Sequence, residues 1–380
     1  MKRLLLRILL IGGLLILAGP HHPVSAQTSE TIRIGAFLPL TGEFSTYGNE
    51  HERGLRLAVD FLNQQGGVQG KKLEFVMIDN QGTQSGTLAA LRKIEQSVNF
   101  PLIFGGIISD LAMTAASFVQ RTGKILFVQT ATNPAIAKLG PNIFRFIFPD
   151  DAQGRMMARF ALQELGVQRV VVFKNTSRLY SSGLAEEFSR AYAAIGGTIV
   201  RTIPYDDSTA DFTSLVEPLK EETNFAVYIP GYDLDTARVI HAFRKTGLHP
   251  TFLGGDAWES INLTNLIPDL DNAFYTTAYA RDIPSEANRD FVKRYRAKYH
   301  TDPTFNAAMG YGAVLLLAEL LEKTDPPWTV EKLRKTLQTT TFNDFTGQPL
   351  RFDKYGNALR PVVIMKFNKG KRTFFKMIHP

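Results

Sequence analysis

The chain has 380 residues, of which 44% are hydrophobic and 21% charged, with 30 Gly and 19 Pro. This composition is typical of a folded chain long enough for two lobes, and it excludes a largely disordered protein. Cysteine is absent. Its absence excludes disulfides, thiolate metal sites, cysteine nucleophiles and the lipid-modified cysteine of a bacterial lipoprotein.

The first 26 residues have the pattern of a secretory signal peptide. Three basic residues, Lys2, Arg3 and Arg7, precede an uncharged, mostly apolar run over 8–19, and small residues end the segment at 24–26. A membrane anchor is the competing interpretation, but an apolar run of 12 residues is too short to cross about 30 Å of hydrocarbon. We therefore expect residues 1–26 to be removed.

Removal of this segment changes the electrostatic character of the chain. Loss of its three basic residues leaves 40 Lys and Arg against 36 Asp and Glu, so the net charge falls from +7 to +4. No cluster of basic residues with interleaved aromatics is present, so we predict no nucleic-acid partner. Export without disulfides or a lipid anchor indicates the periplasm of a double-membraned bacterium.

From residue 31 onward, apolar β-branched runs alternate with segments of helical period. We predict strands at 31–39, 73–78, 101–104 and 125–128, separated by helices around 55–62, 88–98 and 111–119. Short buried strands joined by helices are typical of a parallel sheet covered on both faces. The first third of the chain is therefore predicted to form one wound sheet.

The pattern pauses over 133–149 and then begins again. Further strands are predicted at 169–173, 198–203, 225–229 and 251–253, with helices between them. After residue 285 the prediction is mostly helical, with short closing strands at 349–352, 362–367 and 373–376. The predicted fold class is α/β, with two doubly wound parallel-sheet lobes.

Enzyme motifs are missing from the sequence. It contains no G-x-S-x-G elbow, no complete Walker A loop and no G-x-G-x-x-G after a strand. His51-Glu52 has no second histidine at the spacing of a zinc-binding helix. We therefore predict no catalytic residue, no metal site and no cofactor, and the chain is not expected to be an enzyme.

Polar residues do follow the predicted strands, where doubly wound sheets bind ligands. Ser109 stands at a helix start, where it could bind an anion or simply cap the helix. Thr130 and Thr132 follow the next strand and fall on one side of an extended segment, although a solvated turn would explain them equally. Ile107 and Ile108 suggest an apolar pocket beside Ser109.

The second lobe repeats this arrangement. Tyr232 and Asp256 each follow a predicted strand and neighbour glycines that allow a ligand close to the backbone. Asp256 could receive a cation, or it could cap a helix. Tyr47 and Tyr180 would by themselves be interpreted as half-buried packing residues.

Taken in order, several short motifs resemble those of the leucine/isoleucine/valine-type periplasmic binding proteins of ABC transporters. The similarity covers essentially the whole mature chain, and it rests on the order and spacing of Leu40-Thr41-Gly42, Tyr47-Gly48, the 66–73 turn, the 130–134 segment, Phe144-Arg145, Gln153-Gly154, the 180–183 segment and Gly254-Gly255-Asp256. The resemblance implies the type I periplasmic binding protein fold, in which two lobes joined by a hinge close over an amino acid.

Seven positions match cleft residues of that family: Tyr47, Ser109, Thr130, Thr132, Tyr180, Tyr232 and Asp256. By resemblance, Ser109, Thr130 and Thr132 hold the α-carboxylate, Tyr232 and Asp256 meet the ammonium group, and the other two tyrosines are cleft aromatics. Two residues depart from the family pattern. Asp256 replaces a glutamate, and Thr130 replaces a small apolar residue that contributes only its backbone.

The resemblance implies a monomeric periplasmic protein that delivers an amino acid, neutral or branched-chain, to the permease of an ABC importer. Lobe 1 is expected to comprise 27–149 plus 281–345 and lobe 2 to comprise 150–280 plus 346–380, with hinge strands near 145–149, 279–283 and 345–349. The alternatives are the same fold binding an amide, a urea or an aromatic acid, or acting as a ligand-sensing subunit.

Overall fold

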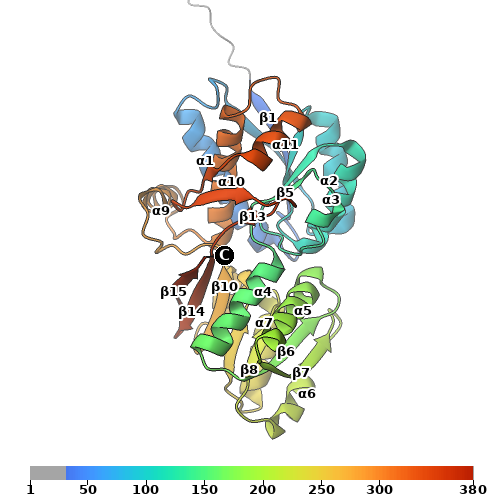
Figure 1. The fold of residues 1–380 in the computed structure, drawn as a ribbon, viewed down its shortest axis with the longest axis vertical. Coiled ribbons are helices and arrows are strands. Elements are labelled where there is room, and N and C mark those ends of the chain that lie inside the picture. Colours follow the sequence, from blue (N-terminus) through green and yellow to red (C-terminus); the bar gives the residue numbers. More distant parts are fainter. Residues whose placement is uncertain (1–30, 380) are drawn as a thin grey trace, which may run out of the picture.

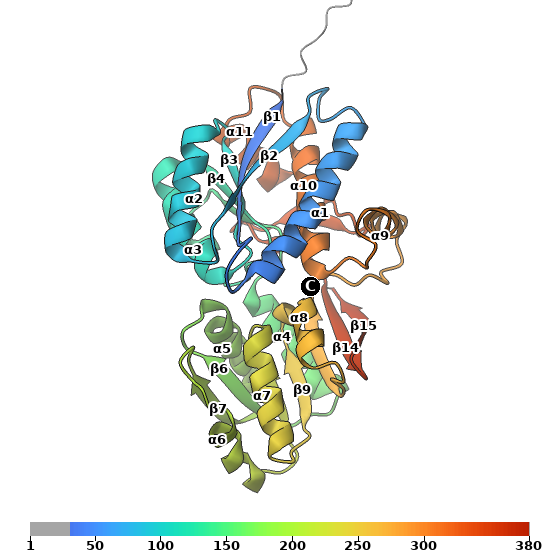
Figure 2. The same cartoon turned by 180° about the vertical axis from the view of Figure 1, so that it is seen from behind.

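The computed structural model describes residues 31–379. The predicted signal peptide, 1–26, lies outside the described residues. Two lobes stacked along the long axis make up the fold, and Figures 1 and 2 show them from opposite sides. The α/β class with two lobes predicted from the sequence is confirmed.

The first lobe is built on a five-stranded sheet in which every pair of neighbours is parallel. Its order is β2-β1-β3-β4-β5, with bounds Ile32–Leu38 (β1), Leu73–Asp79 (β2), Leu102–Gly105 (β3), Ile125–Val128 (β4) and Ile143–Arg145 (β5). The inner strands β3 and β4 are buried throughout, as expected where helices cover both faces of a sheet.

The helices of this lobe come from both ends of the chain. Their bounds are Ser45–Gln64 (α1), Gln84–Ser97 (α2), Ser109–Thr122 (α3), Glu286–Tyr299 (α9), Phe305–Glu322 (α10) and Val330–Thr339 (α11), with a 3₁₀ turn at Ala137–Leu139. Helices α1 and α10 cross closely, since a Cβ at Gly54 would meet the Ala307 carbonyl oxygen. Within residues 31–379, α10 alone is long and apolar enough to span a membrane, and it is mostly buried in the lobe.

The second lobe contains a seven-stranded sheet of order β15-β14-β10-β9-β8-β6-β7. The strands are Arg169–Asn175 (β6), Thr198–Tyr205 (β7), Ala226–Ile229 (β8), Thr251–Gly254 (β9), Ala273–Thr277 (β10), Val362–Asn368 (β14) and Lys371–Ile378 (β15). Strands β6 to β10 run parallel, whereas β14 pairs antiparallel with both β10 and β15. The parallel sheet predicted from the sequence therefore carries an antiparallel edge.

Helices cover this second sheet as they do the first. Their bounds are Asp150–Arg159 (α4), Leu179–Ala194 (α5), Thr213–Val216 (α6), Asp233–Lys245 (α7) and Ile261–Leu266 (α8), with short helical turns at Phe160–Glu164, Glu217–Glu221 and Asp256–Glu259. Helices α5 and α7 begin directly after the carboxyl ends of β6 and β8. Their first residues therefore face the first lobe (Figure 1).

Three chain segments connect the lobes. The predicted hinges near 145–149 and 279–283 correspond to the stretches 146–149 between β5 and α4 and 278–285 between β10 and α9, which we propose as the first two connections. Near the third predicted hinge, 345–349, the chain forms a small sheet of β11 (Phe342–Asn343), β12 (Pro349–Phe352) and β13 (Ala358–Leu359).

This small sheet belongs with the first lobe. The Phe352 ring lies 5.5 Å from that of Phe144 in β5, and the Arg145 amide donates to the Gly356 carbonyl oxygen at 2.7 Å. We therefore propose that the third crossing lies at 360–361 rather than 345–349, and that the C-terminal part of lobe 2 starts at β14 rather than at residue 346. The remaining lobe boundaries stay predictions.

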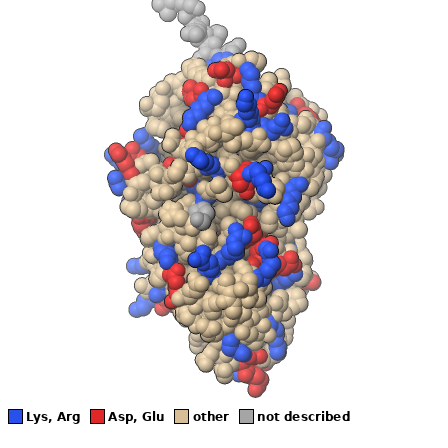
Figure 3. Space-filling model, viewed as in Figure 1, with Lys and Arg blue, Asp and Glu red and all other residues tan. Residues whose placement is uncertain are grey.

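The surface mixes both signs of charge. On the face drawn in Figure 3, basic and acidic side chains are interspersed over both lobes, and no continuous basic area forms there. A backbone-tracking nucleic-acid site needs clustered Lys and Arg on one face. The face in Figure 3 lacks this feature.

Candidate functional site

The first lobe contributes hydroxyl groups from the carboxyl ends of β3 and β4. Gly106 has φ +75°, which turns the chain between β3 and the start of α3. Ser109 follows as the first residue of α3, and its Oγ accepts only a long hydrogen bond, 3.4 Å, from the Asn133 amide. Thr132 Oγ1 is buried and makes no hydrogen bond of ordinary geometry. It lies close enough to the Asp150 carboxyl to lower the pKa of Asp150.

Thr130 differs from its neighbour two residues later. Its Oγ1 donates to the Ile107 carbonyl oxygen at 3.1 Å, so its hydroxyl proton is already used within the first lobe. By resemblance, this position contributes only its backbone to the ligand. The hydrogen bond to Ile107 fits that role, because it occupies the hydroxyl proton of Thr130. Thr132 is therefore the better placed of the two to donate to a ligand.

Arg145, at the end of β5, supports the loop that carries these threonines. It is fully buried, and its Nη1 donates to the Thr132 and Asn133 carbonyl oxygens, the latter at 2.9 Å. Nε and Nη2 donate to Asn357 Oδ1 at 3.0 and 2.7 Å. These contacts satisfy the buried guanidinium, and removing them would leave its N–H donors without partners in the interior.

The second lobe contributes a buried carboxylate. Asp256 begins the short turn after β9 and is 5% exposed. Its Oδ1 accepts a hydrogen bond from Tyr180 Oη at 3.0 Å, and its amide donates to Gln153 Oε1 at 2.9 Å. Residues 31–379 provide no ion pair to Asp256. A cationic ligand group would therefore supply a charge that the surrounding protein does not.

Burial governs the titration of the acidic groups here. It raises the pKa of Asp256 to about 6, while hydrogen bonds to Gln153 and Tyr180 act in the opposite direction. Burial also raises the pKa of the neighbouring Asp150 to about 8, which the negative charge of Asp256 reinforces and the positive charge of Arg145 opposes. Both shifts show that a carboxylate at this position is poorly solvated.

Aromatic side chains from both lobes enclose the space between these polar groups. The Tyr232 ring lies 5.8 Å from that of Tyr47, 5.2 Å from that of Tyr180 and 5.0 Å from that of Phe44. Tyr47 of the first lobe donates from its Oη to the Ala257 carbonyl oxygen of the second lobe at 3.2 Å. The two lobes are thus in direct contact, and the structure represents a closed form.

The cavity between the lobes has a volume of about 20 Å³, room for about one water molecule and well below the roughly 300–1,000 Å³ of small-molecule sites, so the lobes must part to admit a solute. Its lining includes all seven residues expected from the sequence, Tyr47, Ser109, Thr130, Thr132, Tyr180, Tyr232 and Asp256, together with Ile107, Ile108 and Ala131. The structure therefore brings the predicted residues together; the contact of each with a ligand stays a prediction.

Three further residues line the cavity that the sequence did not single out: Ala257, Phe305 and Asn306. Phe305 and Asn306 begin α10, where Thr304 accepts the capping hydrogen bond from the Ala307 amide. In the sequence they appear only as the start of an apolar helix. The sequence feature that could have pointed to them is Thr304, a capping residue that marks the N-terminus of α10.

The site can hold a small molecule by charge and hydrogen bonding. Hydroxyls on one side suit an anionic group, and a desolvated carboxylate on the other suits a cationic group. Among residues 31–379 no group of three or more His, Asp or Glu side chains is arranged to hold a metal ion. The fold and the cavity define a two-lobed solute-binding protein.

The chain belongs to the periplasmic binding protein family, whose model matches residues 31–372. It is a family of solute binders rather than of enzymes. A leucine-, isoleucine-, valine-, threonine- and alanine-binding protein of Pseudomonas aeruginosa is 25% identical to this chain over 337 residues, covering 87% of this chain and 88% of the relative.

Two solved structures share the fold. A leucine-binding protein LivK from Thermotoga maritima superposes with a TM-score of 0.84 at 26% identity, covering 92% of this chain and 99% of that one. A solute-binding protein of Rhodopseudomonas palustris, solved with 3,4-dihydroxybenzoic acid, has a TM-score of 0.77 at 20% identity, covering 92% and 97%. The predicted family and fold are confirmed.

Proposed function

We propose that this protein binds a neutral amino acid, with an aliphatic side chain favoured, and delivers it to an ABC importer in the periplasm. One observation carries the proposal: hydroxyls of the first lobe and the buried Asp256 of the second lobe line the same small cavity. An amino acid has one anionic and one cationic group joined by a single carbon. It can therefore satisfy both sides at once.

The contacts assign each end of the solute. Ser109 Oγ and Thr132 Oγ1, which have weak or no hydrogen bonds of their own, would donate to the carboxylate. Asp256 would receive the ammonium group, with Tyr180 fixing its orientation. Ile107, Ile108 and Phe305 offer the apolar surface for a side chain. The relatives named as leucine-binding support this choice.

An aromatic acid is the second candidate, because the Rhodopseudomonas palustris protein was solved with 3,4-dihydroxybenzoic acid. Such a ligand would use the hydroxyls of the first lobe but would bring no cation to Asp256. A buried carboxylate without a cationic partner is unfavourable. The amino acid therefore fits the site better.

Differential scanning fluorimetry tests the proposal with L-leucine, L-valine, 4-methylpentanoate, leucinamide, urea and 3,4-dihydroxybenzoate. A ligand at 100 times its dissociation constant should stabilise the folded protein by about 2.7 kcal/mol, a readily measured shift in Tm. We expect stabilisation by the amino acids alone. Stabilisation by dihydroxybenzoate, urea or leucinamide but not by any amino acid would refute the proposal.

A further inference from the structure

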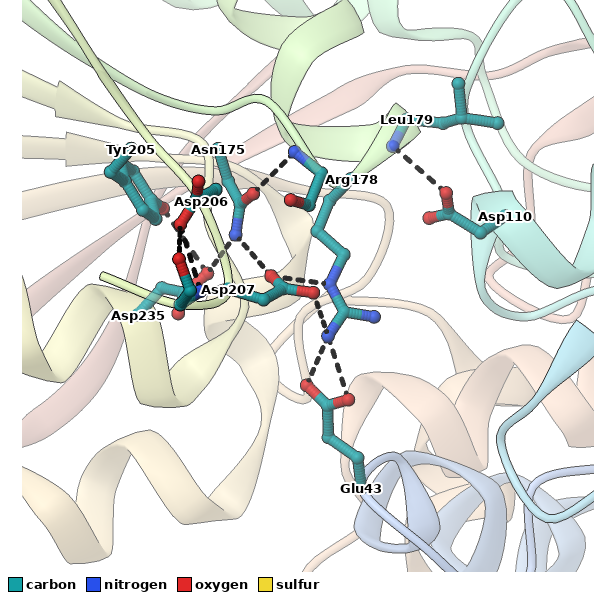
Figure 4. A network of polar contacts seen from close by, with 11 residues as sticks. Glu43, Asp110, Asn175, Arg178, Leu179, Tyr205, Asp206, Asp207 and Asp235 are labelled. Atoms are coloured by element: carbon teal, nitrogen blue, oxygen red, sulfur yellow. Dashed lines mark hydrogen bonds and ion pairs between the residues drawn. The ribbon is translucent and has the colours of Figure 1, made fainter. Parts of the chain in front are cut away.

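Outside the cavity, an ion pair joins the two lobes. Arg178 lies in the second lobe directly before α5, and its Nη2 donates to both carboxylate oxygens of Glu43 in the first lobe at 2.9 Å. The guanidinium also lies 5.2 Å from the centre of the Phe44 ring. Figure 4 shows the side chains of Arg178 and Glu43 extended toward each other.

The second lobe holds this arginine in position. Asp207 accepts from Arg178 Nε at 3.0 Å, and Asn175 Nδ2 donates to Asp207 Oδ1 at 2.9 Å (Figure 4). Asn175 is fully buried and also donates to Asp235. These contacts lie within one lobe, so they persist when the lobes separate. Of the Arg178 contacts, those with Glu43 and the Phe44 ring must break.

The same helix end also contacts the first lobe through its backbone. The Leu179 amide donates to Asp110 Oδ1 at 3.2 Å, and the Leu179 carbonyl oxygen accepts from Asn133 Nδ2 at 2.8 Å. The next residue is Tyr180, which lines the cavity and donates to Asp256. Arg178 thus anchors the segment that completes the site.

We propose that Arg178 is a closure latch: held in place by Asp207, it closes on Glu43, raises the population of the closed form and slows release of the solute. Its effect on release rests on the proposed function, whereas its effect on closure does not. Because the arginine is positioned before closure, little side-chain entropy is lost when the Glu43 contact forms. Arg178 is a positioning residue, since it does not line the cavity.

Disulfide trapping can measure closure in the solute-free protein. The chain has no cysteine, so a pair introduced at Thr46→Cys and Asn262→Cys would be the only one. These two side chains meet across the lobes, with Asn262 Nδ2 3.0 Å from Thr46 Oγ1. The rate of disulfide formation under a mild oxidant then reports the population of the closed form.

Glu43→Gln in this background should slow trapping about two- to fivefold, the range expected for a partly exposed ion pair. Adding Arg178→Gln should slow it little further, because both substitutions remove the same contact. Raising the salt concentration should slow trapping in the parent but not in Glu43→Gln. The matched control is Glu186→Gln, which breaks an exposed ion pair with Lys174 inside the second lobe.

Trapping of Glu43→Gln at the rate of the parent would overturn the latch. In the protein without cysteines, stopped-flow dissociation of L-leucine should be two- to fivefold faster for Glu43→Gln and unchanged for Glu186→Gln. Unchanged leucine dissociation in Glu43→Gln would overturn the effect on release. If the wild-type protein binds neither L-leucine nor L-valine, the proposed function fails, while the trapping rates still decide whether the latch exists.

Discussion

The substitution Asp256→Asn tests whether the Asp256 carboxylate binds the ligand or only caps a helix. Asparagine keeps the shape of the side chain and can still accept the hydrogen bond from Tyr180 Oη. It removes the negative charge at a position that is 5% exposed and has no other ion pair within residues 31–379. The ammonium group of a bound amino acid would then lie buried against a neutral amide.

Leaving one member of a buried charge pair without its partner costs about 3–5 kcal/mol. At about 1.4 kcal/mol per tenfold change, this loss corresponds to a dissociation constant raised by two to three and a half orders of magnitude. L-Leucine should show this loss. 4-Methylpentanoate, which lacks the amine, should bind weakly to both proteins and lose nothing from the substitution.

Isothermal titration calorimetry with both ligands and both proteins makes the comparison. Asp269→Asn is a suitable control, because it also removes one negative charge from the second lobe but breaks only an exposed ion pair with Arg244. Equal losses for L-leucine and 4-methylpentanoate would show that Asp256 does not meet the amine. An unchanged leucine affinity would lead to the same conclusion.

Three further outcomes are expected. Because the pKa of Asp256 is about 6, its ionised fraction falls about tenfold from pH 7 to pH 5. The dissociation constant for L-leucine, measured by fluorescence titration, should therefore rise by up to about tenfold. The absence of such a rise would contradict a charge pair between Asp256 and the ammonium group. The pKa of Asp150 is raised to about 8, so between about pH 4 and pH 8 the folded protein keeps this carboxyl protonated while the unfolded chain ionises it, and stability falls as the pH rises. Asp150→Asn should therefore raise Tm by several degrees at pH 7 and by little at pH 4. A lower Tm at pH 7 would contradict this. Mass spectrometry of the periplasmic protein should find Gln27 as the N-terminus, and an intact Met1 there would exclude cleavage.

Strands of the inner sheets were predictable because they are continuous apolar runs. The predicted strand at 125–128 has the bounds of β4, and the prediction at 169–173 lies within β6. Four strands were missed: β5 and β10 of the large sheets, and the two-residue strands β11 and β13. β5 has only three residues and ends in a buried arginine, and β10, Ala273–Thr277, ends in two threonines. The burial of β5 and β10 depends on neighbouring strands that are distant in the sequence. The local pattern of apolar and polar residues carries no information about such neighbours.

The candidate site was predictable where the proposed ligand-binding residues follow the ends of strands. Ser109, Thr132 and Asp256 all stand within a few residues of a predicted strand, and parallel strands bring such residues to one edge of a sheet. Phe305 and Asn306 were not predictable in this way. They reach the cavity from the start of a helix about 200 residues further along the chain than Ser109. No local feature connects them to the strands.

The division of polar groups between the lobes links solute binding to closure. Ser109 and Thr132 belong to the first lobe and Asp256 to the second, so a solute in the open form meets only one of the two sets. A ligand shifts an equilibrium only by its differential affinity for the two states. Under the proposed function, an amino acid would gain its second set of contacts on closure and would therefore favour the closed form. An acid without an amine gains no charge pair, and so it should bind weakly and leave the lobes apart.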